Sequence, residues 1–140
     1  MTHLLRNSFI VCIIMLMSII AQANEVHDID NQELKNLIQR GVPVVDVRST
    51  SEWEKTGVIE GSHLIMFFDD QGIYNLSAWL EEIEAVANKN EPLALICHSG
   101  GRTKQLANYL VNIAGYNEVY NVEKGIVDWI EQDNPVKPIQ

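Results

Sequence analysis

Cysteine is scarce in this sequence, with Cys12 and Cys97 the two examples among 140 residues. Two cysteines cannot build the disulfide framework of a small secreted scaffold. Cys12 lies in an apolar N-terminal run, and if that run is removed, Cys97 is left as a single thiol without an internal partner. A lone cysteine is commonly a buried apolar residue, so its neighbours decide whether the role is structural or chemical.

Basic residues are also scarce, because 10 lysines and arginines stand against 19 acidic residues. Without Arg6, which lies in the N-terminal segment, the net charge is −10 with histidine neutral. Such a surface repels phosphate backbones, and no basic cluster offsets it, so nucleic acid is not expected as a partner. His27 and His63 are isolated in the sequence, and no metal site is expected.

Long apolar runs are missing after residue 23, and the one at residues 9–20 is well short of the ~20 residues that a membrane-spanning helix needs. Arg6 precedes this run and Ala21-Gln22-Ala23 follows it, which is the pattern of a secretion signal cleaved after Ala23. We predict that residues 1–23 are a signal peptide and that residues 24–140 form one domain. The protein is then exported, to the periplasm, without stable membrane insertion. A retained anchor is the alternative.

The rest of the chain alternates short β-branched runs with helical periods, which predicts an α/β fold. Strands are expected at residues 42–47, 63–68, 92–96 and 118–122. Helices are expected from a cap at Asp30 or Asn31 to Gly41, at 51–55, at 76–87, from about 102 to 114, and at 126–131. Trp53, Trp79 and Trp129 are expected in the core.

Cys97 stands at the carboxyl end of the expected strand 92–96, where open parallel sheets bind their ligands. The next four residues are His98, Ser99, Gly100 and Gly101. The two glycines allow successive backbone N–H groups to turn toward one point and form a nest for an anion. A helix that begins nearby adds unpaired N–H groups and the positive end of its dipole. This pattern predicts a reactive thiolate that solvent can reach rather than a buried thiol.

Two residues at the start of this helix have alternative roles. Arg102 can point into the nest and neutralise a bound anion, or point outward and pin the loop to the body of the domain. Thr103 can donate its hydroxyl to Cys97 or cap the helix. His98 is favoured as an exposed loop residue, because a neighbour at the next position seldom forms a Cys/His dyad.

Charged residues also end the expected strand 42–47. Asp46 and Arg48 are favoured as ion pairs that brace the loop rather than as catalytic groups, with Arg48 and Glu52 suggested as one such pair.

The order of these motifs resembles a single-domain rhodanese, a sulfurtransferase, of the exported, phage-shock-protein-E-like kind. The resemblance is carried by Val45-Asp46-Val47-Arg48 followed by Glu52-Trp53, by residues 57–62, by residues 97–103, by residues 115–116 and 119–122, and by Gly125, Trp129 and Pro135-Val136. The sequence departs from the family pattern at Val58, Ser62 and Lys124, where His, Ala and Gly are usual. None of these is the nucleophile.

The resemblance implies a three-layer α/β/α fold around a mainly parallel sheet of about five strands. It implies that Cys97 takes the sulfane sulfur of a donor such as thiosulfate as a persulfide and passes it to cyanide or a thiol, with no cofactor. Cys97 and Arg102 are the expected catalytic residues. The expected substrate-binding residues are His98, Ser99, Gly100, Gly101 and Thr103, with Asp46, Arg48 and Glu52 as structural support.

Two other functions remain open. A persulfide carrier or thiol sensor would bind sulfur without turning it over. A phosphatase or arsenate reductase of the same fold is disfavoured, because the related phosphatases have one more residue between the cysteine and the arginine than Cys97 and Arg102 have here. The oligomeric state is open as well.

Overall fold

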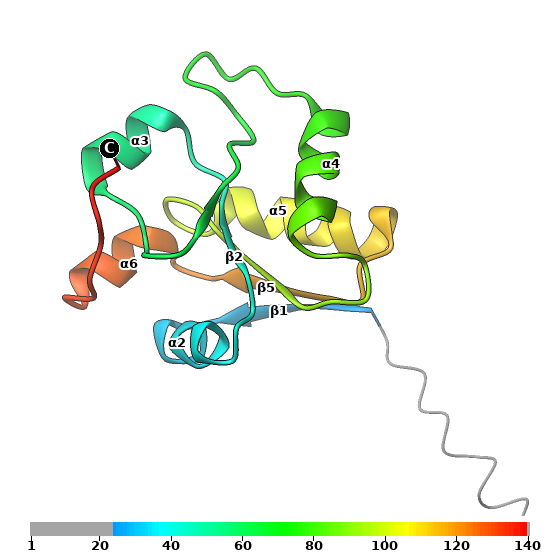
Figure 1. Ribbon diagram of the computed structural model, residues 1–140, viewed down its shortest axis with the longest axis horizontal. Coiled ribbons are helices and arrows are strands. Elements are labelled where there is room, and N and C mark those ends of the chain that lie inside the picture. Colours follow the sequence, from blue (N-terminus) through cyan, green and yellow to red (C-terminus); the bar gives the residue numbers. More distant parts are fainter. Residues whose placement is uncertain (1–23, 140) are drawn as a thin grey trace, which may run out of the picture.

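The computed structural model describes residues 24–139, and the predicted signal peptide lies outside them. The strands are β1 (Glu25–Ile29), β2 (Val44–Asp46), β3 (His63–Leu64), β4 (Leu93–Ile96) and β5 (Glu118–Val122). The helices are α2 (Asn31–Gln39), α3 (Thr50–Thr56), α4 (Leu76–Val86), α5 (Gly101–Tyr109) and α6 (Gly125–Glu131), and a π-helix at Leu110–Ala114 continues α5 (Figure 1). No helix in residues 24–139 combines the length and the apolar character needed to cross a bilayer.

The five strands form one parallel sheet in the order β1-β5-β4-β2-β3. Strand β4 lies at its centre, and all four of its residues are buried. Because every strand runs in the same direction, the carboxyl ends of all five meet at one edge of the sheet. The prediction of an α/β fold with a parallel sheet of about five strands is therefore confirmed.

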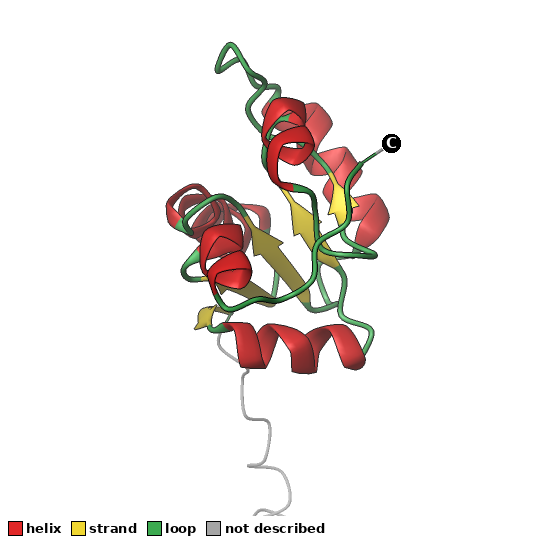
Figure 2. Ribbon diagram, turned by 90° about the vertical axis from the view of Figure 1, so that its left-hand side faces the viewer, coloured by secondary structure: helices red, strands yellow, loops and turns green. Residues whose placement is uncertain are grey.

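Helices cover both faces of this sheet, so the domain has three layers (Figure 2). On one face, α4 and α5 pack Trp79, Ile83 and Leu106 into an apolar cluster that also contains Cys97. On the other face, α2 and α6 form a second cluster that includes Trp129. All three tryptophans are buried, as predicted.

Two elements differ from the sequence prediction. Strand β1 was not expected, because His27 and Asp28 interrupt its apolar pattern; it is an edge strand that pairs only with β5. Strand β3 is shorter than the expected 63–68. Its chain still follows β2 for a few residues, since the Ile65 N–H donates to the Asp46 carbonyl and the Phe67 N–H to the Val47 carbonyl.

Candidate active site

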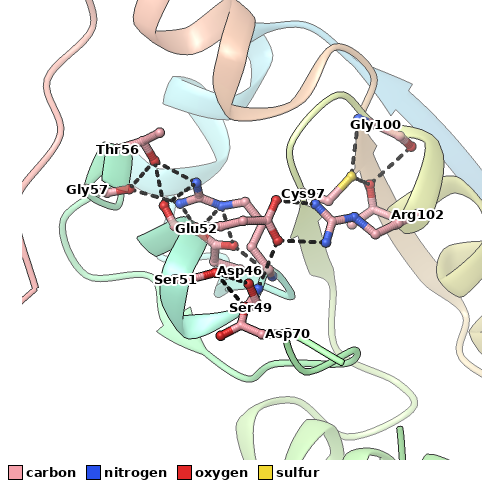
Figure 3. A network of polar contacts seen from close by, with 12 residues as sticks. Asp46, Ser49, Ser51, Glu52, Thr56, Gly57, Asp70, Cys97, Gly100 and Arg102 are labelled. Atoms are coloured by element: carbon pink, nitrogen blue, oxygen red, sulfur yellow. Dashed lines mark hydrogen bonds and ion pairs between the residues drawn. The ribbon is translucent and has the colours of Figure 1, made fainter. Parts of the chain in front are cut away.

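Cys97 follows β4 directly and lies under the loop that leads into α5 (Figure 3). Its Sγ accepts a hydrogen bond from the Gly100 N–H at 3.2 Å and lies 3.3 Å from the Thr103 hydroxyl. Helix α5 begins at Gly101, directly after Gly100, so its N-terminal end lies beside the sulfur of Cys97. The site therefore supplies one backbone donor and a helix dipole to the sulfur, whereas the predicted nest of several N–H groups stays a prediction.

The side chain of Cys97 is nevertheless buried, with 1% of the residue exposed. The expectation that solvent reaches this thiol is therefore wrong for the described conformation. The reason is that Cys97 belongs to the apolar cluster beneath α4 and α5, while the Gly100 N–H and the Thr103 hydroxyl contact its sulfur. His98 and Ser99, which follow Cys97, and Gly101, which begins α5, are themselves exposed.

Two glycines fix the conformation of the loop. Gly100 has φ 91°, and a Cβ at this position would lie 1.8 Å from the Glu123 carbonyl oxygen. Gly125, at the start of α6, has φ 64°, and its Cβ would lie 2.3 Å from the His98 carbonyl oxygen. Only glycine fits either position, because both the positive φ and the close backbone contact exclude a side chain.

The first turn of α6 holds the other side of the loop. The Ile126 N–H donates to the Cys97 carbonyl at 2.9 Å, and the Val127 N–H donates to the His98 carbonyl at 3.2 Å. Lys124, where the family has glycine, has φ −106° and so adopts a conformation open to any residue. This departure from the family pattern therefore leaves the loop intact.

Arg102 points outward and pins the loop to α3. Its two terminal nitrogens donate to the two carboxylate oxygens of Glu52 at 2.8 and 2.6 Å (Figure 3). The bonds to Arg102 lower the pKa of Glu52 to about 2, and the bonds to Glu52 are also the main cause of the raised pKa of Arg102. A smaller part of the rise in the pKa of Arg102 comes from Cys97, so the guanidinium lies near the sulfur.

Arg48 does not form the suggested pair with the Glu52 carboxylate. It is completely buried and forks around Asp46, with Nη2 to Oδ2 at 2.8 Å and Nε to Oδ1 at 3.0 Å. It also donates to the Thr56 hydroxyl at 2.7 Å and to the Gly57 carbonyl at 2.9 Å. Arg48 braces the end of β2 as predicted, but its ion-pair partner is Asp46 rather than Glu52. Asp46 is only two residues from Arg48, and among residues 24–139 no other cation forms an ion pair with its carboxylate.

Thr103 connects Cys97 to Asn121 and Asp28, neither of which was predicted as a site residue. Its hydroxyl donates to Asn121 Oδ1 at 2.6 Å, and Asn121 Nδ2 donates to Asp28 Oδ1 at 2.8 Å. Asn121 and Asp28 are register partners on β5 and β1. No local signal could have found them, since only the pairing of two strands far apart in the chain brings them beside α5.

A hollow of about 430 Å³ opens beside Arg102, and Phe67, Tyr74 and Tyr109 are among the residues that line it. Phe67 and Tyr74 belong to the loop that precedes α4 and Tyr109 to α5, so the hollow lies between this loop and α5. Within the described residues, no group of three or more His, Cys, Asp and Glu side chains is arranged to hold a metal ion.

Comparison with known proteins gives a consistent result. The family model described as "Rhodanese-like domain" matches residues 30–132. The chain is 29% identical over 119 residues to Thiosulfate sulfurtransferase 18 of Arabidopsis thaliana, covering 82% of this chain and 86% of that protein. It is 27% identical over 105 residues to Thiosulfate sulfurtransferase GlpE of Pseudomonas savastanoi pv. phaseolicola, covering 75% and 88%. A rhodanese-related protein of Thermoplasma volcanium has a similar structure, with a TM-score of 0.59, 27% identity, and coverage of 81% and 99%.

Proposed function

Because the chain belongs to the rhodanese-like family, we propose that it is a sulfurtransferase that carries sulfur on Cys97. The observation that carries the proposal is the position of Cys97 Sγ: it follows the central strand, accepts the Gly100 N–H and lies at the start of α5. Sulfur transfer is the activity for which two of the similar proteins are named. The donor and acceptor proposed here are thiosulfate and a thiol or cyanide.

In the first step the Cys97 thiolate attacks the sulfane sulfur of thiosulfate. The new bond joins Sγ to that sulfur, the sulfur–sulfur bond of the donor breaks, and sulfite leaves with the bonding electrons. In the second step cyanide or a thiolate attacks the outer sulfur, and the electrons of the Sγ–S bond return to Cys97. Splitting one transfer into two displacements is the advantage of a covalent intermediate.

The negative charge of the outer sulfur needs stabilisation in both steps. The Gly100 N–H donates to Sγ, and the N-terminal end of α5 adds its dipole. Because Cys97 is 1% exposed, loading requires the short loop after Cys97 to open. The rate of loading therefore measures both the opening and the chemistry.

The arrangement of Arg102 argues against a phosphatase or arsenate reductase. An arginine that serves a phosphoryl group must turn its guanidinium toward the oxygens of that group. Here both terminal nitrogens are bound to Glu52 at 2.8 and 2.6 Å. The short spacing from Cys97 to Arg102 favours the same conclusion.

The test is the intact mass of the protein after incubation with thiosulfate and then with cyanide. We expect the protein to gain one sulfur atom that cyanide removes with release of thiocyanate, and we expect Cys97→Ser to gain none. Sulfur that loads but is not discharged by cyanide or thiols at a useful rate would instead identify a carrier. Hydrolysis of a phosphate ester that depends on Cys97, with no sulfur gain, would refute the proposal.

We also propose that the protein is of the exported, phage-shock-protein-E-like kind and acts in the periplasm after removal of residues 1–23. The support is the sequence of the N-terminal segment, with Arg6 before the apolar run and Ala21-Gln22-Ala23 after it. Expression of the full chain in a Gram-negative host should give a periplasmic protein that begins at Asn24. A full-length protein in the membrane fraction or the cytoplasm would contradict this.

A further inference from the structure

A chain of hydrogen bonds runs from the surface of the domain to Cys97. It begins at Asp28 on the edge strand β1, crosses Asn121 on β5 and reaches the Thr103 hydroxyl on α5. Thr103 Oγ1 lies 3.3 Å from Cys97 Sγ. Thr103, Asn121 and Cys97 are 0%, 2% and 1% exposed, so water cannot replace any missing partner in the inner part of the chain.

The donor and acceptor of each hydrogen bond in this chain follow from Asp28, the residue at its exposed end. Asp28 is a carboxylate, and its pKa is lowered first by the hydrogen bond from Lys104 and then by that from Asn121, so it only accepts. Asn121 must therefore turn its NH₂ toward Asp28 and its Oδ1 toward Thr103. Thr103 has one hydroxyl proton, and its shortest contact is with Asn121 Oδ1 at 2.6 Å; the alternatives are the Gly100 carbonyl at 3.2 Å and the sulfur at 3.3 Å.

With this proton committed to Asn121, Thr103 presents a lone pair to the sulfur. A lone pair accepts a bond from an S–H group but repels a thiolate. For Thr103 to donate to a thiolate, its proton must leave Asn121 Oδ1, which then stays buried without a partner. A persulfide avoids this conflict, because its negative charge lies on the outer sulfur rather than on Sγ.

We propose that Asn121 is a positioning residue that acts through the Thr103 hydroxyl. It holds resting Cys97 as a thiol, and it disfavours the free thiolate without disfavouring the persulfide. The Gly100 N–H and the dipole of α5 act in the opposite direction on the same atom. The two influences leave Cys97 less reactive at rest than its place at a helix N-terminus suggests.

The inference deepens the proposed function of Cys97, and it is tested without sulfur transfer. The rate at which iodoacetamide alkylates Cys97 is measured by intact mass across a range of pH, for wild type and Asn121→Leu. Leucine has a similar volume and removes both polar atoms. Thr103 is then free to donate to the thiolate, and we expect alkylation about tenfold faster at pH 7, equal to a displacement of the pH profile by about one unit toward acid.

Thr103→Val supplies the matched control. If Asn121 acts through the hydroxyl, Asn121→Leu/Thr103→Val reacts no faster than Thr103→Val alone, while Thr103→Ser keeps the wild-type profile. The proposal is overturned if folded Asn121→Leu reacts at the wild-type rate or more slowly, or if its gain persists when the hydroxyl is absent. A failure to load sulfur from thiosulfate would refute the proposed function and leave this result unaffected.

Asp28→Asn covers the case in which Asn121→Leu does not fold, because the side chain of Asp28 is 38% exposed. Without the carboxylate, Asn121 is free to turn its amide, and we expect a displacement toward acid that is smaller than that of Asn121→Leu. Lys104→Gln changes the charge at the same end of the chain and leaves the Asp28–Asn121 bond in place, so it measures the through-space contribution. If the pH profile of alkylation for Asp28→Asn equals that of wild type once the through-space contribution is subtracted, the proposal is contradicted.

The other charged groups around the loop are the same in all these variants, so they cannot produce the expected difference. They are Arg102 on α5, Glu52 on α3, Asp46 and Arg48 at the end of β2, His98 in the loop, and Glu123 and Lys124 before α6.

Discussion

Replacement of Gly125 by alanine tests whether α6 fixes the active loop. A Cβ at this position would lie 2.3 Å from the His98 carbonyl oxygen and 2.6 Å from the Cys97 carbonyl oxygen, so the backbones must separate by about 0.7 Å to reach 3.0 Å. The positive φ of 64° adds the strain of a left-handed conformation. The loop cannot yield freely, because the Ile126 and Val127 N–H groups hold the same two carbonyls.

The expected cost is the sum of two effects. The left-handed conformation costs about 1–2 kcal/mol for a residue with a side chain, and forced overpacking costs typically about 1–3 kcal/mol. We expect Gly125→Ala to lower the free energy of unfolding by about 2–5 kcal/mol. Because the loop carries Cys97, we also expect sulfur loading from thiosulfate to slow by about 10- to 100-fold, as for other displacements of reacting groups near 1 Å.

Gly61→Ala is the matched control, since Gly61 has φ 79° and nothing lies within 4 Å of its added Cβ. It should show the conformational strain of about 1–2 kcal/mol alone, with normal loading. The assays are urea denaturation of both variants and the mass-based loading rate. If the two variants lose the same stability and load sulfur equally well, the contact between α6 and the loop does not control the site.

Three further predictions concern the supports of the site. In the folded protein the pKa of Glu52 is about 2 against an ordinary 4.5, so its pair with Arg102 stabilises the fold above about pH 4.5, and this stability is lost as the pH falls toward 2. Glu52→Gln should therefore reduce the loss of unfolding free energy between pH 4.5 and 2 by about 1–2 kcal/mol, after allowance for solvent screening. An unchanged loss of stability over this pH range contradicts the prediction. Arg48→Met leaves Asp46 buried and unpaired and should lower the free energy of unfolding by about 3–5 kcal/mol, much of which a second change of Asp46 to Leu restores. Deletion of residues 136–140 removes two 2.8 Å backbone bonds with Val58 and should cost about 1–3 kcal/mol in a denaturation experiment.

The sequence predicted the parts of the site that depend on short spacing. Cys97, the glycines and the start of α5 are neighbours along the chain, so a strand end, a tight turn and a helix start follow from local patterns. The α/β class follows in the same way from the alternation of strands and helices, whereas the three-layer arrangement was implied by the resemblance to the family. The resemblance to the family extended this prediction to sulfur chemistry.

Contacts between distant parts of the chain were not predictable. Glu52 meets Arg102 only because α3 and α5 both begin at the same edge of the sheet. Asn121 meets Thr103 only because β5 lies beside β4 with a particular register. The burial of Cys97 was missed for a similar reason, since the loop sequence shows its glycines but not how closely α6 presses it onto the sheet.

The closed position of Cys97 bears on how such a protein survives among oxidants. A bulky disulfide cannot approach a sulfur that is 1% exposed unless the neighbouring loop moves, whereas a persulfide would place its outer sulfur about 2 Å beyond Sγ. Under the proposed function, other thiols therefore react with the outer sulfur of the persulfide rather than with Sγ. If Cys97 carries sulfur as proposed, its burial therefore keeps the unloaded cysteine from mixed disulfides in the described conformation.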